Sequence, residues 1–405
     1  MIEGKNFLIT GSQPWDTQIG STIKNTAVEL SKKNNVIFLN TPIDYKGYYA
    51  KEVDPINAYR KKMIKEKLTP VRKLGNTFWV LDCPFMVFPV GQLPTPLFNF
   101  FNMWNNKKIA KYLKKVLPDF GFEKYFLITD MDIYRSLYLK ELLNPELFIF
   151  YKRDHIIDEP YWLKHGYKCE KELVEKSDIV LANSLYFANQ LRDWNSNIYD
   201  LETGVNLELY DFDGARKIPE DIKPIKKPII GYTGALLTSR LDIDLLYFVA
   251  QQRPDYSLVL VGPEDPQFEK HDLHKLDNVY FLGRKEVEEL PDYISSFDVC
   301  INPQVINKLT IGNYPLKIDE YLAMGRPVIA TPTETMKHIF DKYSFLPNDR
   351  EEYLRMLDQA IAESNDPEKV KERVVFGRSH SWANSVAKIY NAIEKTLAKR
   401  ASEKA

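Results

Sequence analysis

The chain has 405 residues, with 55 Lys and Arg against 56 Asp and Glu, and 44% of its residues are hydrophobic. This length exceeds what one hydrophobic core usually serves, so we predict two domains. The near-zero net charge excludes a generally basic nucleic-acid-binding protein and an acidic solubilising tail. The three cysteines lie far apart and form no C-x-x-C pair. This spacing predicts neither a disulfide framework nor a thiolate zinc site, and it favours a reducing, cytoplasmic compartment.

Two features bear on export and membrane insertion. The first residues, MIEGKNFLITGSQPWD, lack the basic start and apolar run of a secretory signal. The most hydrophobic stretch, residues 84–104, is interrupted by three prolines. We therefore predict neither a signal peptide nor a membrane span.

Residues 6–40 begin the first predicted domain. The apolar runs FLIT and VIFL flank a segment with helical apolar spacing, which predicts a βαβ unit. Further strand-like runs, FWVLD, YFLIT, LFIFY and DIVLAN, alternate with helical segments. This alternation predicts an α/β, Rossmann-like domain over residues 1–210, built on a mostly parallel sheet.

Residues 211–227 are charged and proline-rich, which predicts a linker. The alternation resumes over residues 228–378 with the runs PIIGYTG, SLVLVG, VYFLG, DVCINP and PVIAT, so we expect a second Rossmann-like domain. Residues 379–405 have helical apolar spacing, and we expect this helix to pack back on the N-terminal domain. Two such domains are expected to face one interdomain cleft.

The run NYPLKIDEYLAMGRPVIAT (313–331) carries the most specific pattern in the chain. Pro315 suits the first turn of a helix and Gly325 its C-terminal end. Lys317 and Glu320 are three residues apart, so they share one face near the helix N-terminus, where an anion is also favoured. Such a pair could hold a ribose diol and a phosphate. The alternative is a surface ion pair.

The same run resembles the donor-binding signature of nucleotide-sugar-dependent glycosyltransferases with the two-domain GT-B fold. Successive segments of that family are matched, in the same order, by CEKELVEKSDIVLANS, ETGVNLELYD, GYTGALLTSRLDIDLL, RPDYSLVLVGP and NVYFLGRKEVEELPDYISSFDVCINP. The resemblance covers most of the chain. It is closest to bacterial enzymes of cell-surface polysaccharide or teichuronic-acid assembly.

The resemblance implies a set of donor-binding residues. Glu320 matches the acidic residue that binds the donor ribose, and Pro315 with Lys317 matches the P-x-K element before it. Arg240 matches a cation near the phosphates, whereas Gly312 stands where many members carry a second acidic residue. The remaining positions match the family's phosphate, nucleobase and sugar loops: Gly231, Gly234, Gly283, Arg284, Thr331, Thr333 and Glu334.

In the first domain, the resemblance places the loop from Gly11 to Gly20 beside the acceptor. Trp15 could stack on a sugar ring and Asp16 could accept hydroxyl protons; the alternative is a packed Trp and a capping Asp. Asp154 and His155 follow the strand LFIFY, where a His could hydrogen-bond the acceptor or the reacting sugar. A structural role is the alternative for that pair.

Three D-x-D sequences occur, at 130–132, 211–213 and 242–244. This motif holds a divalent metal in another class of glycosyltransferases, but it is too frequent in a highly charged chain to predict a metal site here. Asp130 follows a predicted strand, and we interpret it as facing the acceptor. Neither a P-loop nor a full G-x-G-x-x-G sequence is present, which disfavours ATP hydrolysis and dinucleotide redox chemistry.

Residues 51–73 carry eight Lys or Arg against three Asp or Glu and lead into the aromatic stretch 84–104. This arrangement suits docking on an anionic membrane surface where lipid-linked acceptors reside. A solvated helix followed by a buried loop is the alternative.

Together these features predict a metal-independent glycosyltransferase with no tightly bound cofactor, and the resemblance implies that it retains the configuration of the transferred sugar. Its donor would be a nucleoside-diphosphate sugar and its acceptor a lipid-linked or polysaccharide glycan. We predict a cytoplasmic protein that is peripheral on the inner face of the cell membrane, with no nucleic-acid partner. Two alternatives remain: a sugar-nucleotide epimerase of the same architecture, and a non-catalytic sugar-nucleotide-binding relative.

Overall fold

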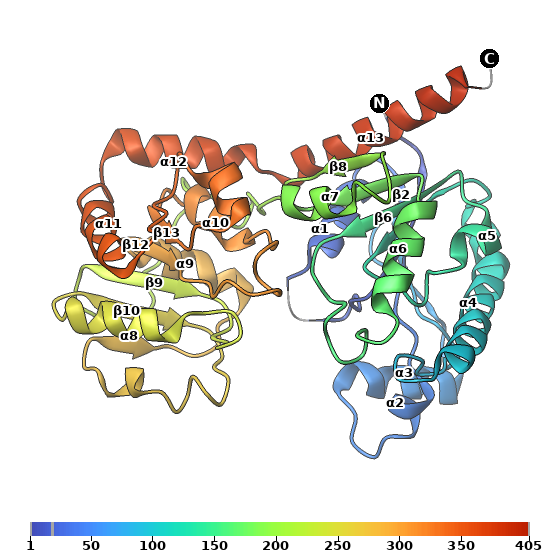
Figure 1. Cartoon of the computed structure of the whole chain (residues 1–405), viewed down its shortest axis with the longest axis horizontal. Coiled ribbons are helices and arrows are strands. Elements are labelled where there is room, and N and C mark those ends of the chain that lie inside the picture. The colour runs from blue at the N-terminus through green and yellow to red at the C-terminus, as the bar shows by residue number, and fades with distance from the viewer. Residues whose placement is uncertain (1, 18–19, 404–405) are drawn as a thin grey trace. The chain divides into compact units, whose positions relative to one another are not determined.

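The computed structural model describes residues 2–17 and 20–403, and the chain divides into two compact units (Figure 1). Unit 1 comprises Met1–Leu201 and Ser385–Ala405, and unit 2 comprises Glu202–Asn384. Each unit is built on a largely parallel β-sheet covered by helices. The predicted fold class, two Rossmann-like α/β domains, is confirmed.

The described part of unit 1 contains an eight-stranded sheet in which only the β3–β4 pair is antiparallel. In spatial order its strands are β3 (Val71–Lys73), β4 (Phe78–Leu81), β2 (Asn35–Leu39), β1 (Asn6–Gly11), β5 (Phe126–Asp130), β6 (Leu147–Lys152), β7 (Ile179–Ala182) and β8 (Ile198–Asp200). Side chains along β1 alternate between two cores: Phe7 and Ile9 enter one, and Leu8 enters the other. This alternation explains why the strand is apolar throughout.

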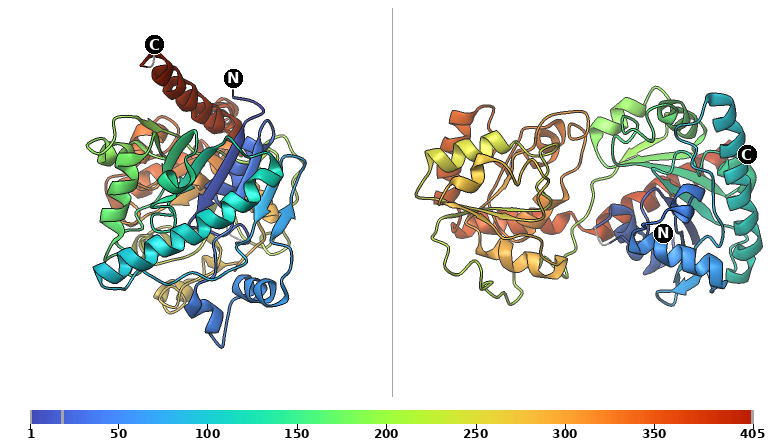
Figure 2. Two further views of the ribbon diagram at one scale, coloured as in Figure 1. Left: turned by 90° about the vertical axis from the view of Figure 1, so that its right-hand side faces the viewer. Right: turned by 90° about the horizontal axis from the view of Figure 1, so that it is seen from below.

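Helices cover both faces of this sheet. Those of unit 1 are α1 (Thr22–Ser31), α2 (Tyr45–Tyr49), α3 (Pro55–Glu66), α4 (Thr95–Val116), α5 (Leu139–Leu143), α6 (Gly166–Lys176), α7 (Leu185–Leu191) and α13 (Trp382–Ser402). The core residues of α4 and α6 pack on one face (Figure 2), whereas those of α1 and α13 pack on the other. The short 3-10 helix η1 (Leu117–Phe120) follows α4.

Unit 2 contains a five-stranded parallel sheet. In spatial order its strands are β11 (Val279–Phe281), β10 (Ser257–Val261), β9 (Ile229–Thr233), β12 (Val299–Asn302) and β13 (Val328–Ala330). Its helices are α8 (Ile243–Gln252), α9 (Leu290–Ser296), α10 (Leu316–Ala323), α11 (Arg350–Ala362) and α12 (Pro367–Ser379), with the short turns η2 (Asp272–Lys275), η3 (Val287–Glu289) and η4 (Met336–Phe340). Core residues of α9 and α10 pack on one face of the sheet, and those of α8 and α11 pack on the other.

The division between the units falls earlier than the sequence predicts. Residues 202–210 belong to unit 2, and so do residues 211–227, which we predicted to be a linker. Tyr210, Ile222 and Ile225 are buried in the core beneath α10. The charged composition of this segment therefore conceals a few apolar anchors that attach it to unit 2.

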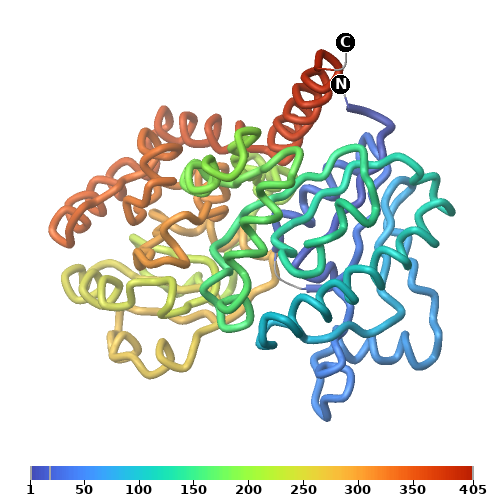
Figure 3. The backbone as a smooth tube through the Cα atoms, turned by 45° about the vertical axis from the view of Figure 1, so that its right-hand side comes forward, coloured from blue at the N-terminus to red at the C-terminus, as the bar shows by residue number. Residues whose placement is uncertain are grey.

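The C-terminal helix α13 begins at Trp382, and from Ser385 onward it belongs to unit 1. Val386, Ile389 and Ile393 are buried there with Ile2 and residues of β1, so the C-terminal helix packs in the same core as the first strand (Figure 3). Among the helices of residues 2–17 and 20–403, none is long and apolar enough to cross a bilayer.

Candidate active site

The candidate donor site lies at the carboxyl ends of β9, β12 and β13, where open parallel sheets bind ligands. Helix α10 begins beside these strand ends. Pro315 occupies the position before its first residue, and Gly325, with φ +71°, follows its last turn. The left-handed conformation at Gly325 ends the helix as predicted. Gly325 thus determines where α10 ends. Lys317 and Glu320 lie in the first two turns of this helix.

Lys317 contacts the end of β9. Its Nζ donates a hydrogen bond to the Tyr232 hydroxyl and lies 3.8 Å from the centre of that ring. Gly234 follows β9 with φ +134°, and a Cβ added there would lie 2.8 Å from the Lys317 Nζ. Glycine at this position therefore allows both the backbone conformation and the close approach of the ammonium group.

The charge of Lys317 is easily removed. Burial lowers the pKa of this ammonium to about 7, the positive charge of Arg240 adds to the effect, and Glu320 opposes it. Arg240 lies in the exposed loop after β9. Two cations that repel each other in this way are arranged to receive an anion, because a bound phosphate would stabilise both charges.

Glu320 lies one helical turn after Lys317. Burial raises the pKa of its carboxyl to about 7, with Asp319 contributing, while Lys317 and a hydrogen bond from Tyr210 oppose the rise. Tyr210 is itself buried, and its pKa is raised by burial and by the Glu320 charge. The tyrosine hydroxyl thus fixes the orientation of one carboxylate oxygen.

Asp319 anchors the start of α10 from the opposite side of the helix. This fully buried carboxylate accepts hydrogen bonds from the Tyr314 hydroxyl at 2.8 Å and from the His380 Nδ1 at 2.7 Å. The His380 Nε2 lies 3.7 Å from a Glu202 oxygen. This network joins both ends of unit 2 to α10 and holds the segment that carries Lys317 and Glu320 in place.

The other predicted donor residues follow neighbouring strands. Gly283 and Arg284 are exposed after β11, and Gly283 has φ +66°. Thr331 follows β13 and donates to the Gln304 carbonyl at 2.8 Å, and buried Thr333 accepts from the Met336 N–H. Glu334 is exposed beside them. Thr331, Thr333 and Glu334 therefore lie at the same edge of the sheet as α10.

One predicted donor residue is not at a strand end. Gly231 lies inside β9, and a Cβ added there would be 2.0 Å from the Phe297 ring. The resemblance implies that Gly231 lies in one of the family's ligand-binding loops, and this prediction is wrong, because Gly231 lies within the strand. The glycine instead makes room for Phe297 in the core of unit 2.

In unit 1, Asp16 belongs to a network at the carboxyl ends of β2 and β4. Arg72 forms hydrogen bonds to both oxygens of Asp16 and both oxygens of Asp82. Asn40 donates to Asp16 at 2.6 Å. Although burial opposes ionisation, the hydrogen bonds from Arg72 and Asn40 lower the pKa of Asp16. Asp16 is therefore an anion held rigidly by its neighbours.

Trp15 packs against other side chains of unit 1, which was the alternative to stacking on a sugar ring. Its ring makes edge contacts with Phe38 and Phe78, with centroids 5.4 and 5.0 Å apart. Gly11 is the last residue of β1, and Gly20 is exposed with open space around its Cα. The loop between them contains residues 18 and 19, which lie outside the described residues.

Asp130 cannot face an acceptor as predicted. It is the last residue of β5, is fully buried, and accepts two hydrogen bonds from Arg153. Burial raises its pKa, and the charge of Arg153 opposes this rise. Asp154 and His155 follow β6 and remain partly exposed, with the His155 Nε2 3.2 Å from an Asp158 oxygen. Unlike Asp130, Asp154 and His155 therefore have accessible polar groups.

The three D-x-D sequences have structural partners. Asp132 binds Arg135, Asp211 and Asp213 both bind Arg378, and Asp242 caps α8 by accepting from the Leu245 N–H at 2.8 Å. Among the residues that the structure describes, no cluster of three or more His, Cys, Asp or Glu side chains is placed to hold a metal ion.

Sequence reasoning missed Tyr210 and Tyr232. Tyr232 lies in the run GYTG, which we interpreted as a buried apolar strand without considering the tyrosine hydroxyl. Tyr210 directly precedes the segment we predicted to be a linker. ETGVNLELYD contains Tyr210 and GYTGALLTSR contains Tyr232, so the resemblance covered both regions without singling out either residue.

Comparison with known proteins finds a family match within unit 2. The model of the family described as "Glycosyl transferases group 1" matches residues 227–373. This segment is similar to a group 1 glycosyl transferase domain. The match includes α10 and all strands of the unit 2 sheet.

A curated protein is similar to part of the chain. The chain is 23% identical over 224 residues to TuaH of Bacillus subtilis (strain 168), which is named as a teichuronic acid biosynthesis glycosyltransferase. The match covers 53% of this chain and 56% of that protein. The chain thus spans little more than half the length of the relative it matches.

Solved structures share the fold over nearly the whole chain. HepE of Anabaena, crystallised with UDP, has a TM-score of 0.64 at 13% identity, covering 96% of this chain and 100% of that one. Sucrose-phosphate synthase from Thermosynechococcus elongatus has a TM-score of 0.66 at 18% identity, covering 98% and 100%. The two units therefore have the GT-B fold.

Proposed function

We propose that the protein is a glycosyltransferase that moves a sugar from a nucleoside-diphosphate sugar to a hydroxyl acceptor. The observation that carries this proposal is the pair Lys317 and Glu320 at the start of α10, whose pKa values both lie at about 7. Such displaced values are typical of sites that bind charged ligands. The group 1 domain and the UDP and UDP-glucose complexes of HepE support it.

The donor contacts follow from the geometry of unit 2. Glu320, oriented by Tyr210, would accept hydrogen bonds from both ribose hydroxyls. Lys317 and Arg240 would bind the diphosphate, with the first N–H groups of α10 adding a favourable dipole. Gly283 and Arg284 would border the nucleobase, and Thr331, Thr333 and Glu334 the sugar.

In the proposed reaction the bond between the anomeric carbon and the diphosphate oxygen breaks through an oxocarbenium-like state. The departing diphosphate takes the electron pair, and Lys317 and Arg240 stabilise its negative charge without a metal ion. The acceptor oxygen then forms the new bond on the same face of the sugar, with retention, and its proton passes to the leaving diphosphate. Asp154 and His155 would position the acceptor.

We further propose that the acceptor is a lipid-linked or polysaccharide glycan at the inner surface of the cell membrane. The exposed stripe of α4 consists of Leu97, Phe100 and Trp104, followed by Lys107 and Lys111. These residues are spaced three and four apart, so they share one helix face. An apolar half followed by a cationic half suits an anionic interface, and the basic helix α3 adds further charge.

The experiment that tests this function is a transfer assay with UDP-, GDP-, ADP- and dTDP-sugars, a membrane-lipid extract as acceptor, and product analysis by mass spectrometry. A glycosylated product that depends on the acceptor supports the proposal. Isomerised nucleotide sugar without acceptor would instead identify an epimerase. Donor binding with neither product would identify a non-catalytic relative.

A further inference from the structure

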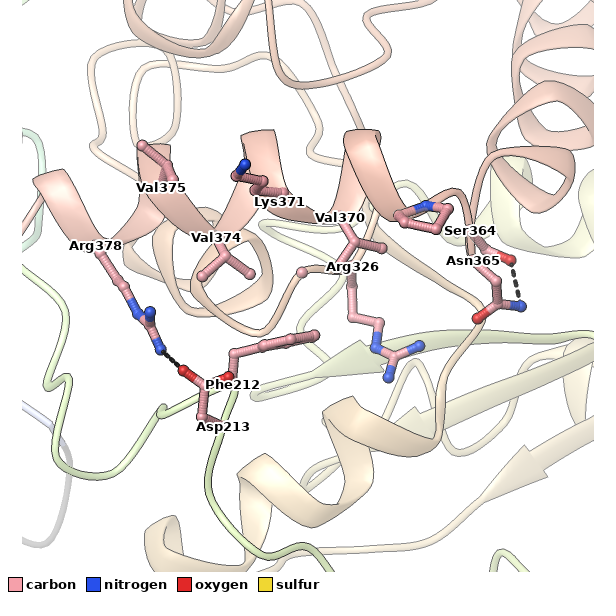
Figure 4. A pocket seen from close by; sticks show the side chains of 12 residues that line it. Phe212, Asp213, Arg326, Ser364, Asn365, Val370, Lys371, Val374, Val375 and Arg378 are labelled. Carbon is pink, nitrogen blue, oxygen red and sulfur yellow. Dashed lines mark hydrogen bonds and ion pairs between the residues drawn. The ribbon is translucent and has the colours of Figure 1, made fainter.

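A cavity of about 630 Å³ lies in unit 2, away from the donor residues. It is lined by residues 212–213, by Gly325 and Arg326 after α10, by the turn at 364–367, and by α12 (Figure 4). Its volume falls within the range of roughly 300–1,000 Å³ that is usual for ligand pockets. No role assigned so far uses this cavity.

The walls of the cavity are mostly apolar. Phe212 faces Val370 and Val374 of α12 across the open space, and Val375 lies on the upper side of the helix in this view (Figure 4). Phe212 is 39% exposed and Val375 is 62% exposed, so this apolar surface is not closed by the chain itself. A Cβ added to Gly325 would lie 3.0 Å from both Phe212 and Val370, so the glycine keeps the floor open.

Positive charge gathers at one end of the cavity. The guanidinium of Arg326 lies beyond one end of the Phe212 ring, whereas the ion pair between Arg378 and Asp213, 2.6 Å long, lies at the other (Figure 4). Among the residues that the structure describes, the buried Nε of Arg326 has no hydrogen-bond partner. No ion pair joins Arg326 or Lys371 to a carboxylate within the same described set.

Two acidic groups in or next to the turn at 364–367 have other partners. Glu363 lies 4.0 Å from Arg373, and Asp366 caps the first N–H groups of α12. Burial lowers the pKa of Arg373, and the neighbouring charge of Arg326 adds to this effect. The Arg326 end of the cavity therefore carries positive charge that no described carboxylate neutralises.

We propose that this cavity binds an anionic amphiphile, a carboxylate or phosphate monoester carried on a single apolar chain. The anionic group would bind Arg326, and the positive charge of Lys371 would also attract it. The apolar chain of the ligand would lie between Phe212 and the valines of α12. Charge complementarity selects an anion over a neutral apolar ligand. The apolar walls select a chain over a bare phosphate.

This site is separate from the donor site. Lys317 lies in the first turn of α10, and Gly325 lies beyond its last turn, about 12 Å further along at 1.5 Å per residue. Helix α12 packs tightly on α10, since a Cβ added to Gly377 would lie 2.3 Å from the Ala323 nitrogen. The inference does not depend on the proposed function, because it concerns binding at the other end of this helix.

Isothermal titration calorimetry on the full chain tests the proposal, with decyl phosphate below its micelle concentration as the probe. We expect one site per chain, at least about tenfold tighter than for decanol and for inorganic phosphate. Arg326→Gln should weaken decyl phosphate binding about tenfold or more, and Arg326→Lys should retain most of it. Lys371→Ala should weaken it several-fold, and the matched control Lys369→Ala, on the same helix but outside the cavity, should not.

Equal affinity for decanol, unchanged binding by Arg326→Gln, or absence of binding would overturn the proposal. If Arg326→Gln unfolds, as circular dichroism would show, Val375→Glu provides the test, since this exposed position can place a negative charge at the mouth without disturbing the core. It should weaken decyl phosphate binding about tenfold. A dimer in sedimentation velocity that Val375→Glu dissociates would assign the surface to a second copy and would also overturn the proposal.

Discussion

The ammonium group of Lys317 lies over the ring of Tyr232, 3.8 Å from its centre, and donates a hydrogen bond to its hydroxyl. The aromatic face and the hydroxyl together stabilise a charge that burial disfavours. Tyr232 thus contacts Lys317 in a way that favours the charged form of the ammonium group.

The first prediction concerns this tyrosine. Tyr232→Phe keeps the ring but removes the hydroxyl acceptor, so Lys317 loses charge near neutral pH and nucleoside-diphosphate affinity should fall several-fold. Tyr232→Leu should cost more, because the ring is lost as well. Calorimetric titration measures both. Tyr256→Phe, which removes a hydroxyl bound to Asp358 far from α10, is the control and should leave affinity unchanged.

Glu320 is predicted to bind the ribose. A hydrogen bond to a charged group contributes about 1.5–3 kcal/mol, so Glu320→Gln should lower kcat/KM for the donor by roughly ten- to a hundredfold. Tyr210→Phe should have a smaller effect, since it frees the carboxylate without removing it. Glu351→Gln on the exposed first turn of α11 serves as the control. Unchanged kinetics for Glu320→Gln would remove the residue from the site.

Donor binding is predicted to take up protons. Because the pKa of Lys317 is about 7 in the free protein, a bound diphosphate should raise it and draw a proton from solution. Affinity should therefore fall as pH rises above about 7. Calorimetry in two buffers with different ionisation enthalpies measures the uptake directly. Because Glu320 also has a pKa of about 7 and releases a proton when its carboxylate binds the ribose, the measurement is repeated on Glu320→Gln, in which equal heats in the two buffers would show that Lys317 does not change its protonation.

The same two groups predict a minimum in stability near pH 7. Glu320 binds more protons in the folded chain than in the unfolded chain between its ordinary pKa of 4.5 and about 7, so stability falls as pH rises through this interval. Lys317 binds fewer protons in the folded chain between about 7 and 10.5, so stability rises with pH there. Urea unfolding across this range should show a shallower minimum for the Lys317→Met/Glu320→Gln variant than for the wild type.

Gly231 provides a test of the corrected structural role. Gly231→Ala should lower the free energy of unfolding by at least about 1–3 kcal/mol, because the new methyl group collides with the Phe297 ring. The double variant Gly231→Ala/Phe297→Leu should recover part of the loss. If the two substitutions were simply additive in urea unfolding, the packing account would be wrong.

The exposed stripe of α4 is predicted to mediate membrane docking. Phe100→Ser/Trp104→Ser should reduce co-sedimentation with vesicles of phosphatidylglycerol and phosphatidylcholine by severalfold. Val28→Ser, an exposed apolar residue of α1 on the opposite face of the sheet, is the matched control. Equal sedimentation of all three proteins, or none at all, would exclude this surface.

The sequence predicted the architecture and the start of α10 because their signals are local. Apolar alternation predicts buried parallel strands, and the spacing of Lys317 and Glu320 places them on one helix face whatever surrounds them. Gly325 was likewise predictable, since a glycine after a helical run favours a left-handed end. These features depend on residues within one or two turns of each other.

The remaining site residues depend on contacts distant in sequence. The hydrogen bonds between Arg153 and Asp130 cannot be predicted from the sequence around either residue alone. Gly231 is indistinguishable from Gly234 until Phe297 is placed against it. Tyr210 joins the site because apolar anchors fold a charged segment onto unit 2, which composition alone conceals.

We propose that Lys317 and Glu320 hold a nucleoside diphosphate at the start of α10. Calorimetric titration of the full chain with UDP, GDP, ADP and dTDP measures this binding. We expect one of the four nucleotides to bind at a single site, and Lys317→Met/Glu320→Gln to abolish the binding while the fold is retained. Binding of equal affinity in the folded double variant would contradict it.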